Sequence, residues 1–238
     1  MQAVDGTVCS NISGDKAIYF FVTDNHDVIQ CHHAEGRFYE LEELSIIARY
    51  FPRGGVFVDI GANVGNHTIY VCHYLHPTQV IIIEPNPAAI TILRINVALN
   101  GLQRLVDMSH LGCGVSDGPG NAQIQTPPGN LGGTKLQPDE KANGVTLIRG
   151  DDILVERRVD FIKMDIEGME MRALAGLAMT ISKWRPSVFV EIDNSNTENF
   201  VVWTKTNGYE IVSKYRRYRS SENYMVVPAE IARQTGSI

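Results

Sequence analysis

The sequence predicts an α/β fold, in which a mostly parallel sheet carries helices on both faces. Apolar runs of strand length alternate along the chain with stretches in which apolar residues recur at helical spacing. The runs 56–60 and 79–84 contain almost no polar residues, as expected for parallel strands covered on both sides. The last two expected strands, 210–214 and 224–227, follow each other without a helix, which indicates an antiparallel end to the sheet.

Composition limits the classes of protein to which the chain can belong. Its 238 residues are enough for one α/β domain, and 44% of them are apolar, although no stretch is long enough to predict a membrane span. A net charge of −6 argues against general binding of nucleic acid. The start of the chain has no secretory signal, and its four cysteines lie far apart, so we expect reduced thiols and a cytoplasmic protein.

Residues 1–50 are expected to form an extension that packs on the core domain, residues 51–238. Strands at 17–22 and 28–31 would form a hairpin, and residues 40–50 carry the apolar stripe of a helix.

The core domain continues the alternation of strands and helices. Residues 117–144 are rich in glycine and proline and predict an irregular excursion that covers the substrate. In chain order we expect a helix over 68–75, a helix over 88–99, a strand over 105–115, a short strand over 122–125, a strand over 145–148, a turn over 150–152, a strand from 159 to Asp165, a helix carrying Met171, Leu174, Leu177 and Met179, a strand over 186–191 and a helix over 197–207.

The turn after the strand 56–60 predicts a cofactor site. Gly61 and Gly65 allow the backbone to turn sharply and to approach a ligand closely. A dinucleotide site would place G-x-G-x-x-G here, whereas this turn has Asn63 between glycines four residues apart and Asp59 on the strand before it. A carboxylate at this position would repel a pyrophosphate but suit a sulfonium, which favours S-adenosylmethionine over NAD.

A second acid supports this cofactor. Glu84 ends the strand 79–84 and is placed to accept hydrogen bonds from both ribose hydroxyls of an adenosyl group. The cofactor contacts that we predict are Asp59, Gly61, Asn63, Gly65, Asn66, His67, Glu84, Pro85, Asn86 and Asp165.

Three further acids are predicted to be catalytic. Asp165 and Glu167 follow one strand and Glu191 ends another, so all three should reach the crevice at the carboxyl ends of the parallel strands. One of them would take the proton of an acceptor hydroxyl, and His67 and His110 are other possible bases. Glu167 also fits a carboxylate that satisfies the free N–H groups of a helix start.

Asp165 with the pair Asp193 and Asn194 offers a possible magnesium site. Acids and amides are also common in helix caps and turns, and we predict no metal ion here.

Four motifs in register resemble the FkbM family of S-adenosylmethionine-dependent methyltransferases. They are V-F-V-D-I-G-A-N-V-G-N-H-T, I-I-I-E-P-N-P, V-D-F-I-K-M-D-I-E-G-M-E and R-P-S-V-F-V-E-I, and they lie within residues 37–195. The resemblance implies a Rossmann-like class I methyltransferase with a seven-stranded sheet over residues 51–238. It also implies O-methylation of a hydroxyl on a sugar, glycan or secondary metabolite. Residues 149–152 depart from the family pattern, so no role is transferred to Asp151.

Other readings compete with this function. The acceptor would be RNA if the basic run 214–219 joined a larger positive surface, although we favour an ordinary surface role for that run. A protein acceptor, or a module that binds S-adenosylmethionine without catalysis, is also compatible with the motifs. We expect a small-molecule or glycan acceptor, no membrane and no nucleic acid, and the sequence predicts no particular oligomeric state.

Overall fold

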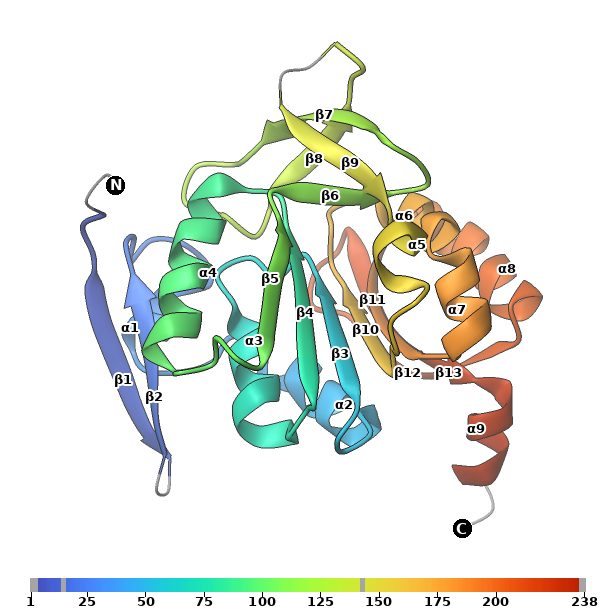
Figure 1. The fold of residues 1–238 in the computed structure, drawn as a ribbon, viewed down its shortest axis with the longest axis horizontal. Helices are drawn as coiled ribbons and strands as arrows, with labels where there is room; N and C mark the ends of the chain where they lie inside the picture. The colour runs from blue at the N-terminus through green and yellow to red at the C-terminus, as the bar shows by residue number, and fades with distance from the viewer. Residues whose placement is uncertain (1–3, 14–15, 142–143, 236–238) are drawn as a thin grey trace.

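The computed structural model describes residues 4–13, 16–141 and 144–235, and a seven-stranded sheet forms its centre (Figure 1). Five neighbouring strands run parallel, and the last two pair antiparallel at one edge, which confirms the predicted fold class. In spatial order the strands are β12 (Tyr209–Tyr215), β13 (Ser221–Pro228), β11 (Ser187–Asp193), β10 (Phe161–Met164), β3 (Val56–Ile60), β4 (Gln79–Glu84) and β5 (Val106–Leu111).

Helices cover both faces of this sheet, because its strands are apolar on both sides. On β3, Phe57 faces one layer of helices, while Val58 and Ile60 face the other. The first layer contains α2 (Leu41–Tyr50), α3 (Asn66–Tyr70), the π-helix η1 (Val71–Leu75), α4 (Pro87–Leu99) and α9 (Ala229–Thr235). The second contains α5 (Gly150–Leu154), α6 (Glu170–Gly176), α7 (Ala178–Trp184) and α8 (Thr197–Thr206), which follows the short 3-10 helix η2 (Asn194–Asn196). Among the described residues, no helix is both long and apolar enough to cross a membrane.

The N-terminal hairpin is built from a different pair of strands than the sequence predicts. β2 (Lys16–Val22) pairs with β1 (Thr7–Ser13), whereas residues 28–31 form a turn and the start of α1 (Gln30–Ala34). The buried carboxylate of Asp27 accepts hydrogen bonds from the backbone N–H groups two and three residues later, at 3.1 and 3.0 Å. This side-chain cap favours helix over strand at that point. The division of the chain at residue 50 stays a prediction.

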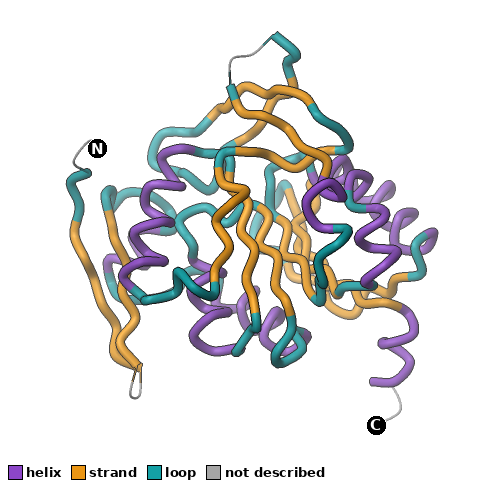
Figure 2. The backbone as a smooth tube through the Cα atoms, in the orientation of Figure 1, coloured by secondary structure: helices purple, strands orange, loops and turns teal. Residues whose placement is uncertain are grey.

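The chain between β5 and α5 forms a separate four-stranded sheet, which the sequence does not predict. The expected strand 105–115 breaks at Gly112, whose φ of 97° lies in the left-handed region, and the chain continues in another direction. Figure 2 shows this small sheet beyond the end of β5. Its strands, in spatial order, are β6 (Cys113–Ser116), β9 (Val145–Arg149), β7 (Gly120–Gln125) and β8 (Lys135–Pro138).

Smaller differences concern helices. Residues 150–152 belong to α5 rather than to a turn, since the Asp151 carboxylate accepts the backbone N–H of Thr180 on α7 at 2.8 Å and thereby joins the two helices. The helix predicted over 68–75 is π-helical from Val71. The long helix expected after Asp165 is divided at Leu177 into α6 and α7.

Candidate functional site

A cavity of about 420 Å³ opens at the carboxyl ends of the parallel strands, where the sequence places the site. A smaller cavity adjoins it and shares Gly61 and Asp165 with it. Of the predicted site residues, the large cavity is lined by Gly61, Asn63, Asn66, His67, Asp165, Glu167 and Glu191, and the small one by Gly61, Glu84, Pro85 and Asp165.

The glycine turn is packed so tightly that a side chain does not fit at its first position. Gly61 has a φ of 82°, and a Cβ atom there would lie 1.9 Å from the carbonyl oxygen of Asp165. Asn63 also has a left-handed φ, 49°, and its buried side-chain oxygen has no hydrogen-bond partner. Backbone at a strained turn and an unsatisfied buried oxygen at the wall of a cavity are features of a ligand site.

Glu84 is held rigidly beside the small cavity. Its two carboxylate oxygens accept the backbone N–H groups of Asn63 at 2.8 Å and Asn86 at 2.7 Å, and only 5% of the residue is exposed. Burial raises the pKa of Glu84 to about 7, and these two hydrogen bonds oppose the rise. The remaining lone pairs of its oxygens are available to hydroxyl donors. The apolar part of the same cavity includes Ile83, Val115, Leu136, Ile166 and Met169.

The structure does not place Asp59 where the sequence predicts it. The residue is fully buried and lines neither cavity. Its carboxylate accepts a hydrogen bond from the Thr68 hydroxyl at 2.7 Å and lies 3.4 Å from the ammonium of Lys163, its partner in register on β10. A buried lysine thus takes the position beside Asp59 that we assign to the ligand, and it also donates to the carbonyl of Gly61 at 2.8 Å. Asp59 therefore acts on the turn through Lys163.

Asn66 and Asn86 hold neighbouring segments in place. The side-chain amide of Asn66 accepts the backbone N–H of Tyr39 and donates to its carbonyl, both at 2.9 Å. These two hydrogen bonds fix the N-terminal segment over the turn. Asn86 caps α4 by accepting the N–H of Ala88 at 3.0 Å, and it donates to Thr134 in the excursion at 2.9 Å. Asn86 lines neither cavity, so it shapes the site by anchoring the excursion.

Gly65 and His67 lie at the start of α3. Gly65 precedes the helix with a φ of 95° and lines neither cavity. His67 is buried, its Nε2 atom lies 3.7 Å from the Glu40 carboxylate, and that nitrogen has no hydrogen-bond partner. Burial, followed by the charge of Lys163, lowers the pKa of His67 well below its usual value, so the ring is neutral at physiological pH.

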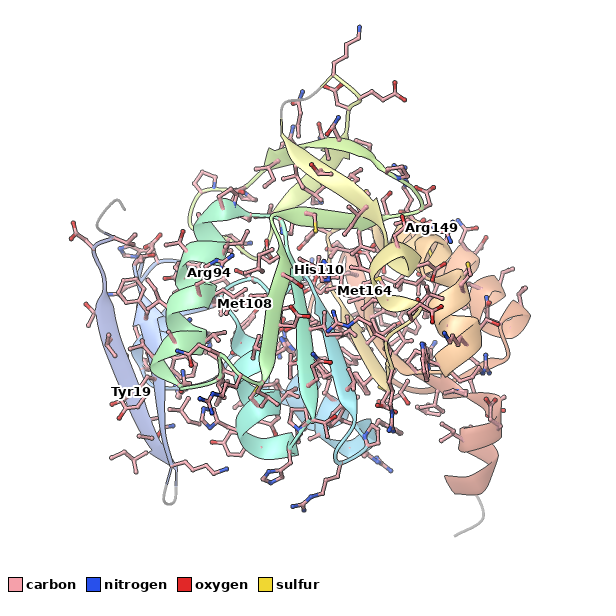
Figure 3. All side chains as sticks on the ribbon, viewed as in Figure 1. Tyr19, Arg94, Met108, His110, Arg149 and Met164 are labelled. Atoms are coloured by element: carbon pink, nitrogen blue, oxygen red, sulfur yellow. The ribbon has the colours of Figure 1, made fainter. Side chains whose placement is uncertain are left out.

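The three predicted catalytic acids meet in the large cavity. Asp165, Glu167 and Glu191 each offer a carboxylate oxygen, and these oxygens all lie within 4.8 Å of one another. Burial and then the charge of Asp165 raise the pKa of Glu167 to about 7, and the same two causes raise the pKa of Glu191. The Ser221 hydroxyl orients Glu191 by donating to it at 2.8 Å. His110 lies on β5 (Figure 3). It lines neither cavity.

Sequence reasoning missed several residues of the cavity wall. Lys163 interrupts an apolar strand, and Glu170 follows Glu167 by three residues in the same motif. Both residues are buried, and these positions were the signal in the sequence that could have predicted it. Glu40 and Lys135 carry no such signal, because the N-terminal segment and the excursion bring them to the site only through the tertiary fold.

The basic run 214–219 contacts the protein itself. Arg217 donates to both carboxylate oxygens of the buried Glu43 at 2.6 Å. Arg216 lies 3.6 Å from the carboxylate of Glu222. The run therefore connects the β12–β13 loop to α2.

Of the three residues considered from the sequence as a magnesium site, Asp165 and Asp193 line the large cavity and Asn194 does not. Asp193 lines the large cavity, but one of its oxygens accepts both the N–H and the hydroxyl of Ser195. The Asn194 amide donates to the carbonyl of Arg219 at 2.7 Å.

Comparison with known proteins gives consistent matches. A family model described as the methyltransferase FkbM domain matches residues 59–220. Methyltransferase sdnD of Sordaria araneosa is 26% identical over 180 residues, with 57% of this chain and 69% of that protein covered. The solved structure of methyltransferase FkbM from Methylobacillus flagellatus KT has a TM-score of 0.51 at 19% identity, and the match covers 72% of this chain and 43% of that one. TrmK of M. capricolum, solved with its cofactor product S-adenosyl-homocysteine, has a TM-score of 0.52 at 13% identity, covering 81% and 70%.

Proposed function

The chain belongs to the family of methyltransferase FkbM domains, and on that premise we propose that it transfers a methyl group from S-adenosylmethionine to a hydroxyl of a sugar, glycan or secondary metabolite. One observation carries the proposal: an apolar cavity with a fixed carboxylate meets a larger acidic cavity at Gly61 and Asp165. The Glu84 carboxylate at the small cavity, which has a volume of about 30 Å³, suits the ribose edge of an adenosyl group, while the large cavity of about 420 Å³ has room for the acceptor. The two cavities meet where a methyl group would pass to the acceptor.

The residues present fit the cofactor. Glu84 keeps lone pairs free for two ribose hydroxyls, Pro85 and Met169 give the small cavity an apolar wall, and Asn63, whose side-chain oxygen has no partner, lines the large cavity. The solved TrmK, which has the same fold, contains the cofactor product. When bound, S-adenosylmethionine supplies a methyl group on a positively charged sulfur, which becomes a neutral thioether as the methyl group leaves.

The acids of the large cavity would remove the acceptor's proton. The hydroxyl oxygen forms the new bond to carbon, so its proton has to leave, and a hydroxyl is a poor nucleophile until it does. Glu167, with a pKa of about 7, is matched to this task near neutral pH, and Glu191 lies beside it. The fixed turn and strand ends would hold the acceptor in line, which contributes part of the rate enhancement.

Charge supports an acceptor without phosphate groups. Among the described residues, six carboxylates line the large cavity against two lysines, and one of those, Lys163, is already paired with Asp59. The acids are Glu40, Asp165, Glu167, Glu170, Glu191 and Asp193. Such a lining repels polyanions, which disfavours RNA, and its oxygens suit a neutral acceptor with several hydroxyls. A cytoplasmic location belongs to the same proposal, since all four cysteines are free thiols.

The test combines calorimetry with a methyl-transfer assay. S-adenosylmethionine should bind the wild-type protein more tightly than NAD, and Glu84→Ala should weaken that binding about tenfold or more because it removes the ribose acceptors. Glu191→Gln should keep cofactor binding but lose transfer of labelled methyl groups to a panel of sugars and glycosides. Binding of NAD instead of S-adenosylmethionine would refute the cofactor assignment. Methylation of RNA but of no small acceptor would favour the alternative substrate class, and unchanged turnover in Glu191→Gln would remove its catalytic role.

A further inference from the structure

We propose that Asp165, Glu167 and Glu191 bind one divalent cation with a preference for oxygen ligands, such as Mg²⁺ or Mn²⁺, in the large cavity. The existence of this site does not depend on the proposed reaction. Its role as an aid to hydroxyl activation rests on the proposed function.

The geometry of the three carboxylates suits such an ion. Their nearest oxygens all lie within 4.8 Å of one another. Two oxygens on opposite sides of a Mg²⁺ ion are about 4 Å apart, and on opposite sides of Ca²⁺ about 5 Å. The side chains of Asp165 and Glu167 are 33% and 29% exposed, so small rotations can close the remaining gap. The ligands come from two neighbouring strand ends, and open positions toward the cavity remain for water or acceptor oxygens.

A fourth carboxylate gives an independent indication. Glu170 is only 2% exposed, and its Oε1 accepts the N–H of Gly168 at 2.8 Å. Its Oε2 is buried without a hydrogen-bond partner, although the residue lines the same cavity. Asp165 also has a buried oxygen without a partner. Buried carboxylate oxygens are costly to leave unsatisfied, so their presence at one cavity indicates a positively charged ligand.

The neighbouring lysines do not balance these acids. Lys163 lies 4.0 Å from Asp165, but it is closer to Asp59 and donates to the Gly61 carbonyl. Lys135 lies 4.0 Å from Glu167, with 60% of its side chain exposed, so solvent screens it. Four carboxylates therefore face one engaged and one exposed ammonium, and a divalent ion supplies the missing charge without needing another side chain.

A bound cation at this point would serve the chemistry directly. A divalent ion polarises a hydroxyl oxygen beside it and lowers the pKa of that hydroxyl, so the proton leaves more readily near neutral pH. The Ser221 hydroxyl, which donates to Glu191, would hold that ligand in place, and the unpartnered Oε2 of Glu170 would gain a positive charge nearby. This arrangement uses Glu167 and Glu191 rather than Asp193 and Asn194. One oxygen of Asp193 accepts two hydrogen bonds from Ser195, and both polar atoms of the Asn194 side chain have partners.

The test is a titration of the full chain with Mn²⁺, followed by electron paramagnetic resonance of the free ion. One Mn²⁺ should bind per chain and Mg²⁺ should displace it, while Asp165→Asn and Glu191→Gln should each weaken binding about tenfold or more. Asp193→Asn, which changes an acid in the same cavity outside the cluster, is the matched control and should bind as the wild type does. Circular dichroism melts would show that the variants are folded, and each should lose the rise in Tm that Mn²⁺ gives the wild type.

Two results would overturn the inference: no Mn²⁺ binding at millimolar concentration, or equal binding by the wild type and Asp165→Asn. Calorimetry with S-adenosylmethionine on the same samples separates this test from that of the proposed function. A wild-type protein that binds Mn²⁺ but not S-adenosylmethionine would refute the methyl-transfer proposal and leave the cation site standing.

Discussion

Replacing Glu84 with glutamine should make the stability of the protein less dependent on pH. The Glu84 carboxyl is buried between two backbone N–H donors, and its pKa rises from 4.5 to about 7 in the folded chain. Between those two values the folded state binds more protons than the unfolded state does. Stability from this residue is therefore lost as pH rises from about 4.5 to 7, the reverse of a salt-bridged acid.

The size of the effect follows from the two pKa values. Linkage gives a cost from Glu84 of about 0.8 kcal/mol at pH 5 and about 3.3 kcal/mol at pH 8. Glutamine cannot ionise, so it avoids this cost, although its amide leaves one of the two backbone N–H groups without an acceptor, a loss of about 1–2 kcal/mol at either pH. The free-energy difference between Glu84→Gln and the wild type should thus shift by about 2.5 kcal/mol in favour of the variant from pH 5 to pH 8.

Urea unfolding of both proteins at the two pH values, without cofactor, measures this shift. All other titrating groups are shared, so they cancel in the difference between the proteins. Glu210→Gln, at an exposed position of β12, is the matched control, and its difference from the wild type should stay within about 0.5 kcal/mol. A shift for Glu84→Gln no larger than that of the control would show that burial does not penalise the Glu84 charge, and the reasoning would fail.

Three further outcomes are expected. Gly61→Ala should destabilise the fold by more than about 2 kcal/mol in urea unfolding, because its Cβ would lie 1.9 Å from a carbonyl oxygen and its φ is 82°. A change below about 0.5 kcal/mol would contradict the close packing of the turn. In buffer freed of divalent cations, where Glu167 holds no ion, kcat/KM for methyl transfer should rise with pH up to about 7, because Glu167 must be deprotonated to act as base. Glu167→Gln should remove that rising limb, and an unchanged limb would assign it to another group. Arg217→Ala should cost about 3–5 kcal/mol of stability, since it leaves the buried Glu43 carboxylate unpaired. Adding Glu43→Gln to that variant should recover part of the loss. An equal loss in the double variant would show that packing, not charge, is responsible.

Local pattern in the sequence was sufficient for much of the fold. The strands at Val56–Ile60 and Gln79–Glu84 have the predicted bounds, because a run of mostly apolar residues is itself the property that buries a central parallel strand. The meeting of Asp165, Glu167 and Glu191 was also predictable, since parallel strands end at one edge of the sheet and bring their final residues together.

Other features depend on which segments become neighbours, and local pattern does not contain that information. Residues 28–31 have the composition of a strand, but the cap from Asp27 makes them begin a helix, and β1 takes their place in the hairpin. The excursion becomes part of a sheet because β6 and β9, the strands on either side of it, pair with each other. Their pairing depends on the route of the intervening chain.

The role of Asp59 shows the same division most clearly. The sequence alone determined that an acid precedes the glycine turn and that a lysine lies in a later strand. Only the register of β3 against β10 set Lys163 opposite Asp59, so the acid pairs with a lysine inside the protein and lines neither cavity. Residue type and period are local properties, whereas the partner of a buried charge is decided by the packing of the whole sheet.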